Sequence, residues 1–171
     1  MTTATDTATL IDRAQVIDTL NRMAWDQDRK RWTELEDLLA DEIQVGYGED
    51  PEVELVTVSR GDLIANWRSG LDHTSSQHIL TGITVDAVGN TAHATLNETA
   101  FIQGKTPDGL SLYQFGTNME CALRRAPAGW RITSLKVVLG WSTGDPAVLG
   151  SWRRPNDLTR VGFTAPAAAV R

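Results

Sequence analysis

The chain has 171 residues, about the size of one ordinary domain, which allows one sizeable core and is too short for two comfortable domains. Hydrophobic residues make up 41% and charged residues 22% of the sequence, ordinary globular values that exclude a fibrous or disordered body. The formal net charge of −6 disfavours nucleic acid and anionic membranes as partners, because both need an excess of lysine and arginine on one face.

The two ends of the chain differ from its body. Residues 1–9 and 164–171 are small, polar or alanine-rich and lack an amphipathic pattern, so we expect both to fray or to pack on a neighbour. No apolar run approaches the length of a membrane span, and the N-terminus lacks the basic start and apolar stretch of a secretory signal. We therefore expect a cytoplasmic protein with a flexible N-terminus at residues 1–9, one domain at residues 10–145 and a partly flexible extension at residues 146–171.

Three helices are predicted in the first part of the chain. The first runs from about residue 10 to residue 27, and its inward stripe at helical spacing consists of Leu10, Ile17, Leu20 and Ala24. The second is shorter and ends near residues 40–41, with an apolar face made of Trp32, Leu35, Leu38 and Leu39. The third begins after Ser59, which matches the Ser-x-x-Asp form of a helix cap, and its apolar face consists of Leu63, Ile64 and Trp67.

Strand patterns dominate the rest of the chain. Residues 43–47 alternate between apolar and polar, and the run at residues 53–58 adds a second, irregular piece. Four long alternating segments separated by turn sequences follow, at residues 77–86, 91–103, 111–125 and 130–139. Helices first and antiparallel strands afterwards predict an α+β fold, with the helices packed against one face of a curved sheet.

Asp28 is the first candidate for chemistry, because it lies one helical turn beyond Ala24 and continues the inward stripe. Asp26 is expected to point the opposite way. A buried carboxylate must be paired or hydrogen-bonded, since an isolated buried charge costs several kcal/mol. The alternative, that the helix has already frayed and Asp28 belongs to a solvated charged run, stays open on pattern alone.

His78 is the second candidate, at the start of the first long strand between polar and apolar neighbours. Imidazole is the side chain best suited to moving protons near neutral pH, and a carboxylate beside it fixes its tautomer and supports its charged form. Pairing with Asp28 would satisfy both side chains. The alternative is a structural histidine at a strand end, and His73 and His93 carry no better signal.

Other kinds of chemistry find little support in the sequence. The three histidines lack the close spacing of a zinc or iron site, and no glycine-rich phosphate-binding motif is present. The single cysteine, Cys121, excludes an internal disulfide and lies in a strand pattern where a thiol is usually a small hydrophobe. We therefore expect no metal, no cofactor and no covalent nucleophile.

Three stretches of the sequence resemble the SnoaL-like proteins, and particularly their scytalone dehydratase branch. The first is residues 28–47, in which an aspartate, a tryptophan and a tyrosine stand at the family's spacing as Asp28, Trp32 and Tyr47. The second is residues 76–82, which contain the Gln-His pair of Gln77 and His78, and the third is residues 129–141. The resemblance covers residues 10–145, nearly the whole domain.

The resemblance implies a nuclear transport factor 2-like fold, a cone in which three helices close the open side of a curved sheet around a deep pocket. In the dehydratase branch the residue matching Asp28 orients the residue matching His78, which moves a proton on and off the substrate. The residue matching Tyr47 holds a water that polarises a carbonyl. Hexachlorocyclohexane dehydrochlorinase is similar, with an aspartate and histidine pair that removes a proton during elimination.

The sequence also departs from that branch. Gln27 stands where the branch has a tyrosine, and its second catalytic histidine is replaced by Phe101 in our register. By alternation Asn97 shares the side of Phe101, which we expect to face the pocket, although the opposite assignment to solvent stays open. Thr117 and Met119 are expected to line the pocket from the third long strand, with Trp25, Trp67 and Trp141 as apolar walls.

These expectations add up to a cofactor-independent lyase or isomerase, meaning a dehydratase, a double-bond isomerase or a cyclase. Its substrate is expected to be a hydrophobic cyclic or polyketide-like carbonyl compound, with Asp28, His78 and Tyr47 as catalytic residues. The alternative is a protein of the same fold that only binds a small apolar ligand, and a third reading is an interaction module with a vestigial pocket. A homodimer or homotrimer is expected from the outer face of the sheet.

Overall fold

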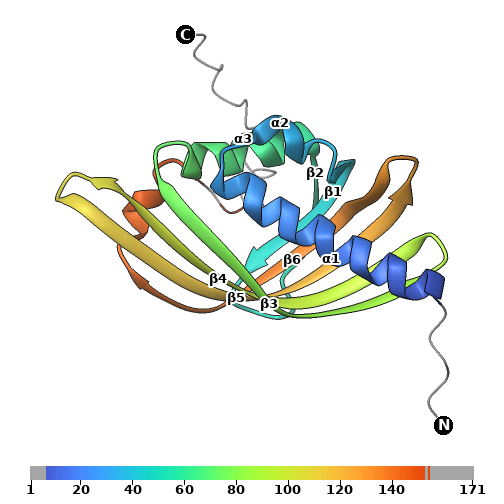
Figure 1. The fold of residues 1–171 in the computed structure, drawn as a ribbon. Coiled ribbons are helices and arrows are strands. Elements are labelled where there is room, and N and C mark those ends of the chain that lie inside the picture. Colours follow the sequence, from blue (N-terminus) through green and yellow to red (C-terminus); the bar gives the residue numbers. More distant parts are fainter. Residues whose placement is uncertain (1–6, 153, 155–171) are drawn as a thin grey trace.

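The computed structural model describes residues 7–152 and 154 (Figure 1). The elements in chain order are α1 (Thr7–Asp28), α2 (Trp32–Leu35), β1 (Leu39–Gly48), β2 (Val56–Ser59), α3 (Arg60–Leu71), β3 (Ser75–Val88), β4 (Thr91–Thr106), β5 (Gly109–Ala126), β6 (Gly129–Gly144) and the 3-10 helix η1 (Pro146–Leu149). The predicted α+β fold is confirmed. All four long strands lie where the alternating segments predict them, each extended at one or both ends.

The six strands form one sheet in the order β2-β1-β6-β5-β4-β3. Neighbouring strands pair antiparallel except β1 and β6, which run parallel, so the prediction of a purely antiparallel sheet is wrong in this one pairing. Alternation along a strand reports which face is buried and not which strand lies beside it, so the sequence holds no signal for the parallel pair. Figure 1 shows the sheet curving beneath the helices, with α1 lying across it.

The helix boundaries differ from the predicted ones at two places. Residues 7–9 belong to α1, and Leu10 is exposed, so the buried stripe begins further along at Val16. The second helix ends at Leu35, because Leu39 already pairs with Ile132 in the sheet. The remaining residues of the predicted flexible ends, 1–6, 153 and 155–171, lie outside the described residues.

The predicted cap of the third helix is confirmed. The side chain of Ser59 accepts a hydrogen bond from the backbone N–H of Asp62 at 3.1 Å, which satisfies one of the donors that a helix start leaves unpaired. This cap sets the direction in which α3 leaves β2 and passes over the sheet.

The core lies between the concave face of the sheet and the buried faces of the helices. Its largest fully buried side chains include Leu20, Leu35, Leu39, Ile43, Leu63 and Ile132. Close packing of this kind fixes the positions of the helices on the sheet, and with them any side chain carried at a helix end. No helix within the described residues has the length and apolar character that a membrane crossing requires.

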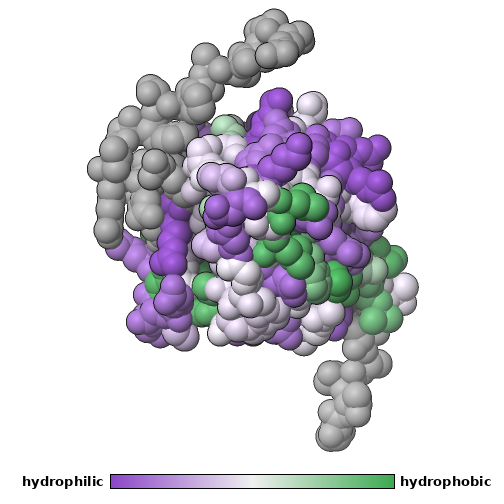
Figure 2. Space-filling model, turned by 90° about the vertical axis from the view of Figure 1, so that its left-hand side faces the viewer, coloured by the Kyte–Doolittle hydropathy of each residue, from purple (hydrophilic) through white to green (hydrophobic). Residues whose placement is uncertain are grey.

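The surface is mostly polar, and Figure 2 shows one patch where apolar residues gather. Large hydrophobic side chains that are exposed in the described residues are Leu10, Ile11, Trp25, Leu55, Ile79, Val88, Leu110, Leu112 and Trp141. Single exposed hydrophobics are normal on a protein surface, whereas a contiguous patch is a feature of interfaces.

Candidate active site

Helix α1 ends in a tight turn that places Asp28 at a fixed point above the sheet. Lys30 adopts the left-handed conformation with φ 58°, while the backbone N–H of Arg31 donates to the carbonyl of Asp26 at 2.8 Å and that of Lys30 donates to the carbonyl of Gln27 at 3.2 Å. This pair of hydrogen bonds is the Schellman arrangement, in which the left-handed residue is usually glycine. The alternative of a frayed helix end is therefore wrong, and Asp28 is the last helical residue.

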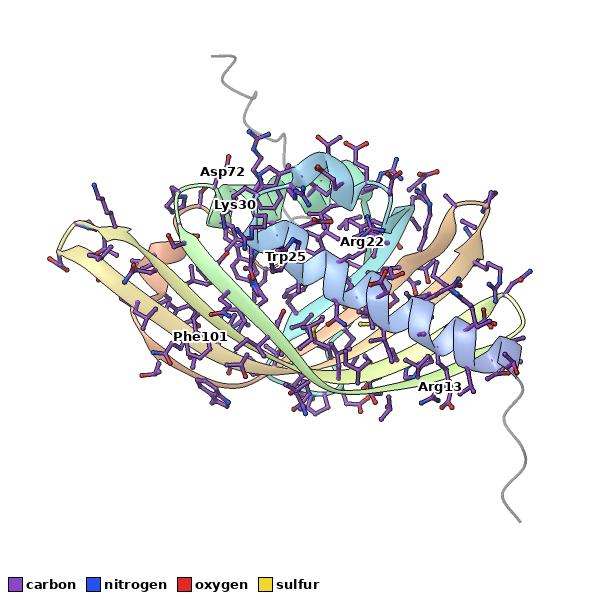
Figure 3. The ribbon with its side chains drawn as sticks, in the orientation of Figure 1. Arg13, Arg22, Trp25, Lys30, Asp72 and Phe101 are labelled. Atoms are coloured by element: carbon purple, nitrogen blue, oxygen red, sulfur yellow. The ribbon has the colours of Figure 1, made fainter. Side chains whose placement is uncertain are left out.

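The strained conformation of Lys30 gives a direct prediction for stability. Its ammonium donates to Ser76 Oγ at 2.9 Å, and Figure 3 shows Lys30 lying beside Asp72 at this end of α1. Lys30→Gly and Lys30→Met both lose the ammonium, but only glycine adopts the left-handed conformation without strain. We expect Lys30→Gly to be more stable than Lys30→Met by about 1 kcal/mol in urea unfolding. Equal stability of the two variants would show that the conformation of Lys30 is not strained.

Asp28 and His78 form a doubly hydrogen-bonded pair between α1 and β3. Asp28 Oδ1 lies 2.7 Å from His78 Nδ1, and Asp28 Oδ2 accepts from the backbone N–H of His78 at 2.8 Å. The backbone bond is possible because β3 is an edge strand, whose outer N–H groups have no neighbouring strand to bind. Only 6% of the His78 side chain and 14% of the Asp28 side chain are exposed, so the pair is shielded from water.

The pair shifts the pKa values of both members toward the charged forms. Burial raises the pKa of Asp28, but hydrogen bonds from His78 and the charge of its ring outweigh burial and hold the pKa below its ordinary value. Burial lowers the pKa of His78, but the hydrogen bond to Asp28 and the charges of Glu98 and Asp28 outweigh it and leave the pKa raised. His78 is therefore poised to carry a proton near neutral pH.

A cavity of about 160 Å³ lies between the helices and the sheet, and His78 forms part of its wall. Asp28 is absent from the lining and contacts the imidazole from behind. The apolar lining includes Met23, Trp67, Leu71, Ile102, Phe115 and Leu135, and the polar lining includes Gln27, Tyr47, Glu98, Thr117 and Arg154. Such a mostly apolar cavity with a few polar groups is the usual form of a small-molecule site.

Four of the residues predicted for the pocket line this cavity: Tyr47, His78, Thr117 and Met119. The predicted wall residue Trp67 also lines it, and its indole N–H donates to the Tyr47 hydroxyl at 3.2 Å. Burial raises the pKa of Tyr47 far above its ordinary value, so the phenol keeps its proton at neutral pH. The catalytic and binding roles given to these residues stay predictions.

Two residues predicted to face the cavity from β4 lie on the opposite side of the sheet. Asn97 is exposed and accepts a hydrogen bond from Asn118 at 2.7 Å, and Phe101 lies away from the helices in Figure 3. The predicted face was wrong because alternation separates two faces without saying which one is inside. The inner face of β4 is the apolar one, with Ala94, Leu96, Ala100 and Ile102 buried.

Two tryptophans predicted as pocket walls are also outside the cavity. Trp25 is 54% exposed on α1 and lies under the guanidinium of Arg29 at 4.4 Å. Trp141 is 50% exposed on β6, where it pairs with Gly116 of β5. Trp25 was predicted as a wall from its residue type, but by helical spacing it lies on the side of α1 opposite the buried Val16 and Met23. Asp26 was expected to point away from the core. It is instead buried, 3.7 Å from the guanidinium of Arg31.

Glu98 is the site residue that the sequence reasoning missed. It lines the cavity from β4, where it interrupts the apolar series of the inner face, and its Oε2 accepts from Thr117 Oγ1 at 3.2 Å. A charged residue within an alternating apolar series is the same kind of signal that identifies Asp28, and it was available in the sequence. Within residues 7–152 and 154, no three His, Cys, Asp or Glu side chains converge to hold a metal ion.

Comparison with solved structures shows the same architecture in proteins of low sequence identity. A provisionally assigned scytalone dehydratase from Novosphingobium aromaticivorans has a TM-score of 0.68 and 15% identity, covering 81% of this chain and 91% of that one. A nuclear transport factor 2-like protein with a cystatin-like fold, from the same organism, has a TM-score of 0.58 and 19% identity, covering 77% and 83%. A hexachlorocyclohexane dehydrochlorinase from Novosphingobium barchaimii has a TM-score of 0.61 and 15% identity, covering 80% and 91%.

These similarities establish the fold as nuclear transport factor 2-like, as the sequence resemblance implies. Comparison with curated protein sequences gives no significant match. The family model described as the SnoaL-like domain matches residues 8–136, which spans α1 through most of the sheet and includes Asp28, Tyr47, His78 and Glu98. The chain therefore belongs to the SnoaL-like domain family.

Proposed function

We propose that the protein is a cofactor-independent lyase or isomerase, a dehydratase, double-bond isomerase or cyclase that works by proton transfer through Asp28 and His78. The observation that carries this proposal is the 2.7 Å contact between Asp28 Oδ1 and His78 Nδ1, with the ring in the wall of an apolar cavity. Because Nδ1 is held by Asp28, the other ring nitrogen, Nε2, is the atom that exchanges a proton with a bound molecule.

The positions of the three proposed catalytic residues support a distinct role for each. His78 moves the proton, and Asp28 fixes the ring and stabilises the imidazolium. Tyr47 lies in the same wall and stays protonated, which suits it to hold a water that polarises the substrate carbonyl. Dehydration, isomerisation and aldol cyclisation all require removal of a proton next to a carbonyl, and the three residues serve each of them.

The mainly apolar lining supports a hydrophobic cyclic or polyketide-like carbonyl compound as the substrate. The names of two structural neighbours, a provisionally assigned scytalone dehydratase and a hexachlorocyclohexane dehydrochlorinase, belong to elimination enzymes and support the same class. The cytoplasmic location and the homodimer or homotrimer stay predictions.

The experiment is a panel of cyclic ketones, including tetralones and cyclic β-hydroxy ketones, incubated with the protein in D₂O and followed by proton NMR. We expect the protein to accelerate exchange of the proton beside the carbonyl in at least one compound, and loss of water from a β-hydroxy ketone would identify a dehydratase. Saturable binding of panel members without exchange or turnover would contradict the proposal and favour the alternative, a protein that only binds a small apolar ligand.

A further inference from the structure

Glu98 lies beside His78 on the inner face of the sheet. In the register of β3 and β4, His78 is directly opposite Ala100, so Glu98 is the diagonal neighbour of His78 on the same face. Diagonal neighbours have Cα atoms about 7–8 Å apart, a distance that a glutamate and a histidine can bridge with a small molecule between them. Among the described residues that line the cavity, Glu98 is the one carboxylate.

One oxygen of Glu98 is held and the other is available to a ligand. Thr117 is directly opposite Glu98 on β5 and donates to Oε2 at 3.2 Å, and within the described residues Oε1 has no hydrogen bond. Glu98 is half-buried beside apolar side chains, and a single hydroxyl donor offsets only part of the cost of shielding its charge from water. A nearby positive charge would offset more of that cost.

His78 supplies that charge because it lies between two carboxylates. Asp28 binds Nδ1 from behind, which leaves Nε2 on the cavity side where Glu98 also lies. Glu98 and Asp28 both favour the imidazolium, and the raised pKa of His78 is consistent with it. The cavity wall thus presents an acid, the imidazolium N–H, next to a base, the carboxylate.

We propose that Glu98 is a catalytic base that works with His78 as the acid, so that the site removes and donates protons with two different groups. This inference rests on the proposed function, narrows the role of His78 in it to that of the proton donor and selects dehydration of a β-hydroxy carbonyl compound. Glu98 Oε1 takes the proton beside the carbonyl, the C–H electron pair forms the C=C bond and the C–O bond breaks. His78 Nε2 donates its proton to the departing hydroxyl, which leaves as water, and transfer from Glu98 to His78 through solvent restores the site.

The test uses 5-nitrobenzisoxazole, a probe that any well-placed base opens in one step. The base removes its ring C–H proton while the N–O bond breaks, and the nitrophenolate product is followed by absorbance. We expect Glu98→Gln to lower the rate by about 10²-fold or more, and His78→Gln to lower it less, because that variant keeps the base. Glu120→Gln is the matched control, since Glu120 is an exposed carboxylate on the neighbouring strand, 3.5 Å from Lys136.

A second variant separates a base from a structural carboxylate. Glu98→Ala leaves space for a small acid, so formate is expected to restore the rate in proportion to its concentration, and it should not accelerate Glu98→Gln. A wild-type rate no faster than that of Glu98→Gln, or no rescue by formate, overturns the assignment of Glu98. If His78→Gln is then the slow variant, proton transfer through Asp28 and His78 is supported without Glu98. If neither variant is slow, both the proposed function and the assignment of Glu98 are wrong.

Discussion

His78→Gln is expected to lower the rate of water loss by about 10²–10⁴-fold for any β-hydroxy ketone of the panel that the wild-type protein dehydrates, the usual contribution of a positioned acid or base. Glutamine has the length to keep a hydrogen bond to Asp28 but no group that titrates near neutral pH. The rate of water loss, measured by NMR at several pH values, reports this effect directly. Binding of the ketone, measured by calorimetry, is expected to change little.

His93→Gln is the control for this variant. His93 lies on β4 as His78 lies on β3, but its side chain is exposed on the outer face of the sheet. The His93→Gln variant should dehydrate the ketone at the wild-type rate. A His78→Gln rate within about tenfold of the wild-type rate would place the proton transfer on another group.

Asp28→Asn is expected to destabilise the protein by about 2 kcal/mol, because the substitution removes a charged acceptor from two buried hydrogen bonds. The loss should depend on pH. The lowered pKa of Asp28 means that its contribution is present above the unfolded value of about 3.9 and is lost as the pH falls through the folded value. The raised pKa of His78 means that its contribution is complete below about 6.5 and is lost as the pH rises through the folded value.

Urea unfolding of the wild type and of Asp28→Asn between pH 4 and 9 tests both signs at once. The difference in the free energy of unfolding should be largest between about pH 4 and 6.5 and should shrink above the folded pKa of His78. Asp18→Asn provides a matched change, because Asp18 is exposed on the same helix. A difference between wild type and Asp28→Asn that stays constant over the whole range would mean that the pair is not charged.

The sequence predicts the elements well because alternation and helical spacing report burial locally. The four long strands and the cap at Ser59 needed nothing more than that. The parallel pairing of β1 with β6 and the early end of α2 depend on which segments meet in space, and a single sequence carries no direct signal for this. Leu39 shows the point, since an apolar residue after a helix serves equally well in the helix or in a strand.

The residue pattern identified Asp28 and His78 separately, as side chains that each need a partner. The family resemblance predicted that they are partners of each other. Asp28 was predicted to point inward because it lies one helical turn beyond Ala24, which is buried. Leu10, at the other end of the predicted stripe, is exposed. Asn97 was predicted for the pocket and its neighbour Glu98 was missed, because alternation does not say which face of β4 lies inside. An enzyme pocket lies within the core, so its polar groups stand as exceptions in an apolar series, as Glu98 does.

The most direct test of the pair is the titration of His78, followed by NMR of protein labelled with ¹⁵N in its three histidines. We predict that His78 keeps the imidazolium signal above the ordinary pKa of about 6.5 and that Asp28→Asn moves its titration to lower pH. An unperturbed titration of His78 in both proteins would contradict the account of a carboxylate-held imidazolium in the wall of the cavity.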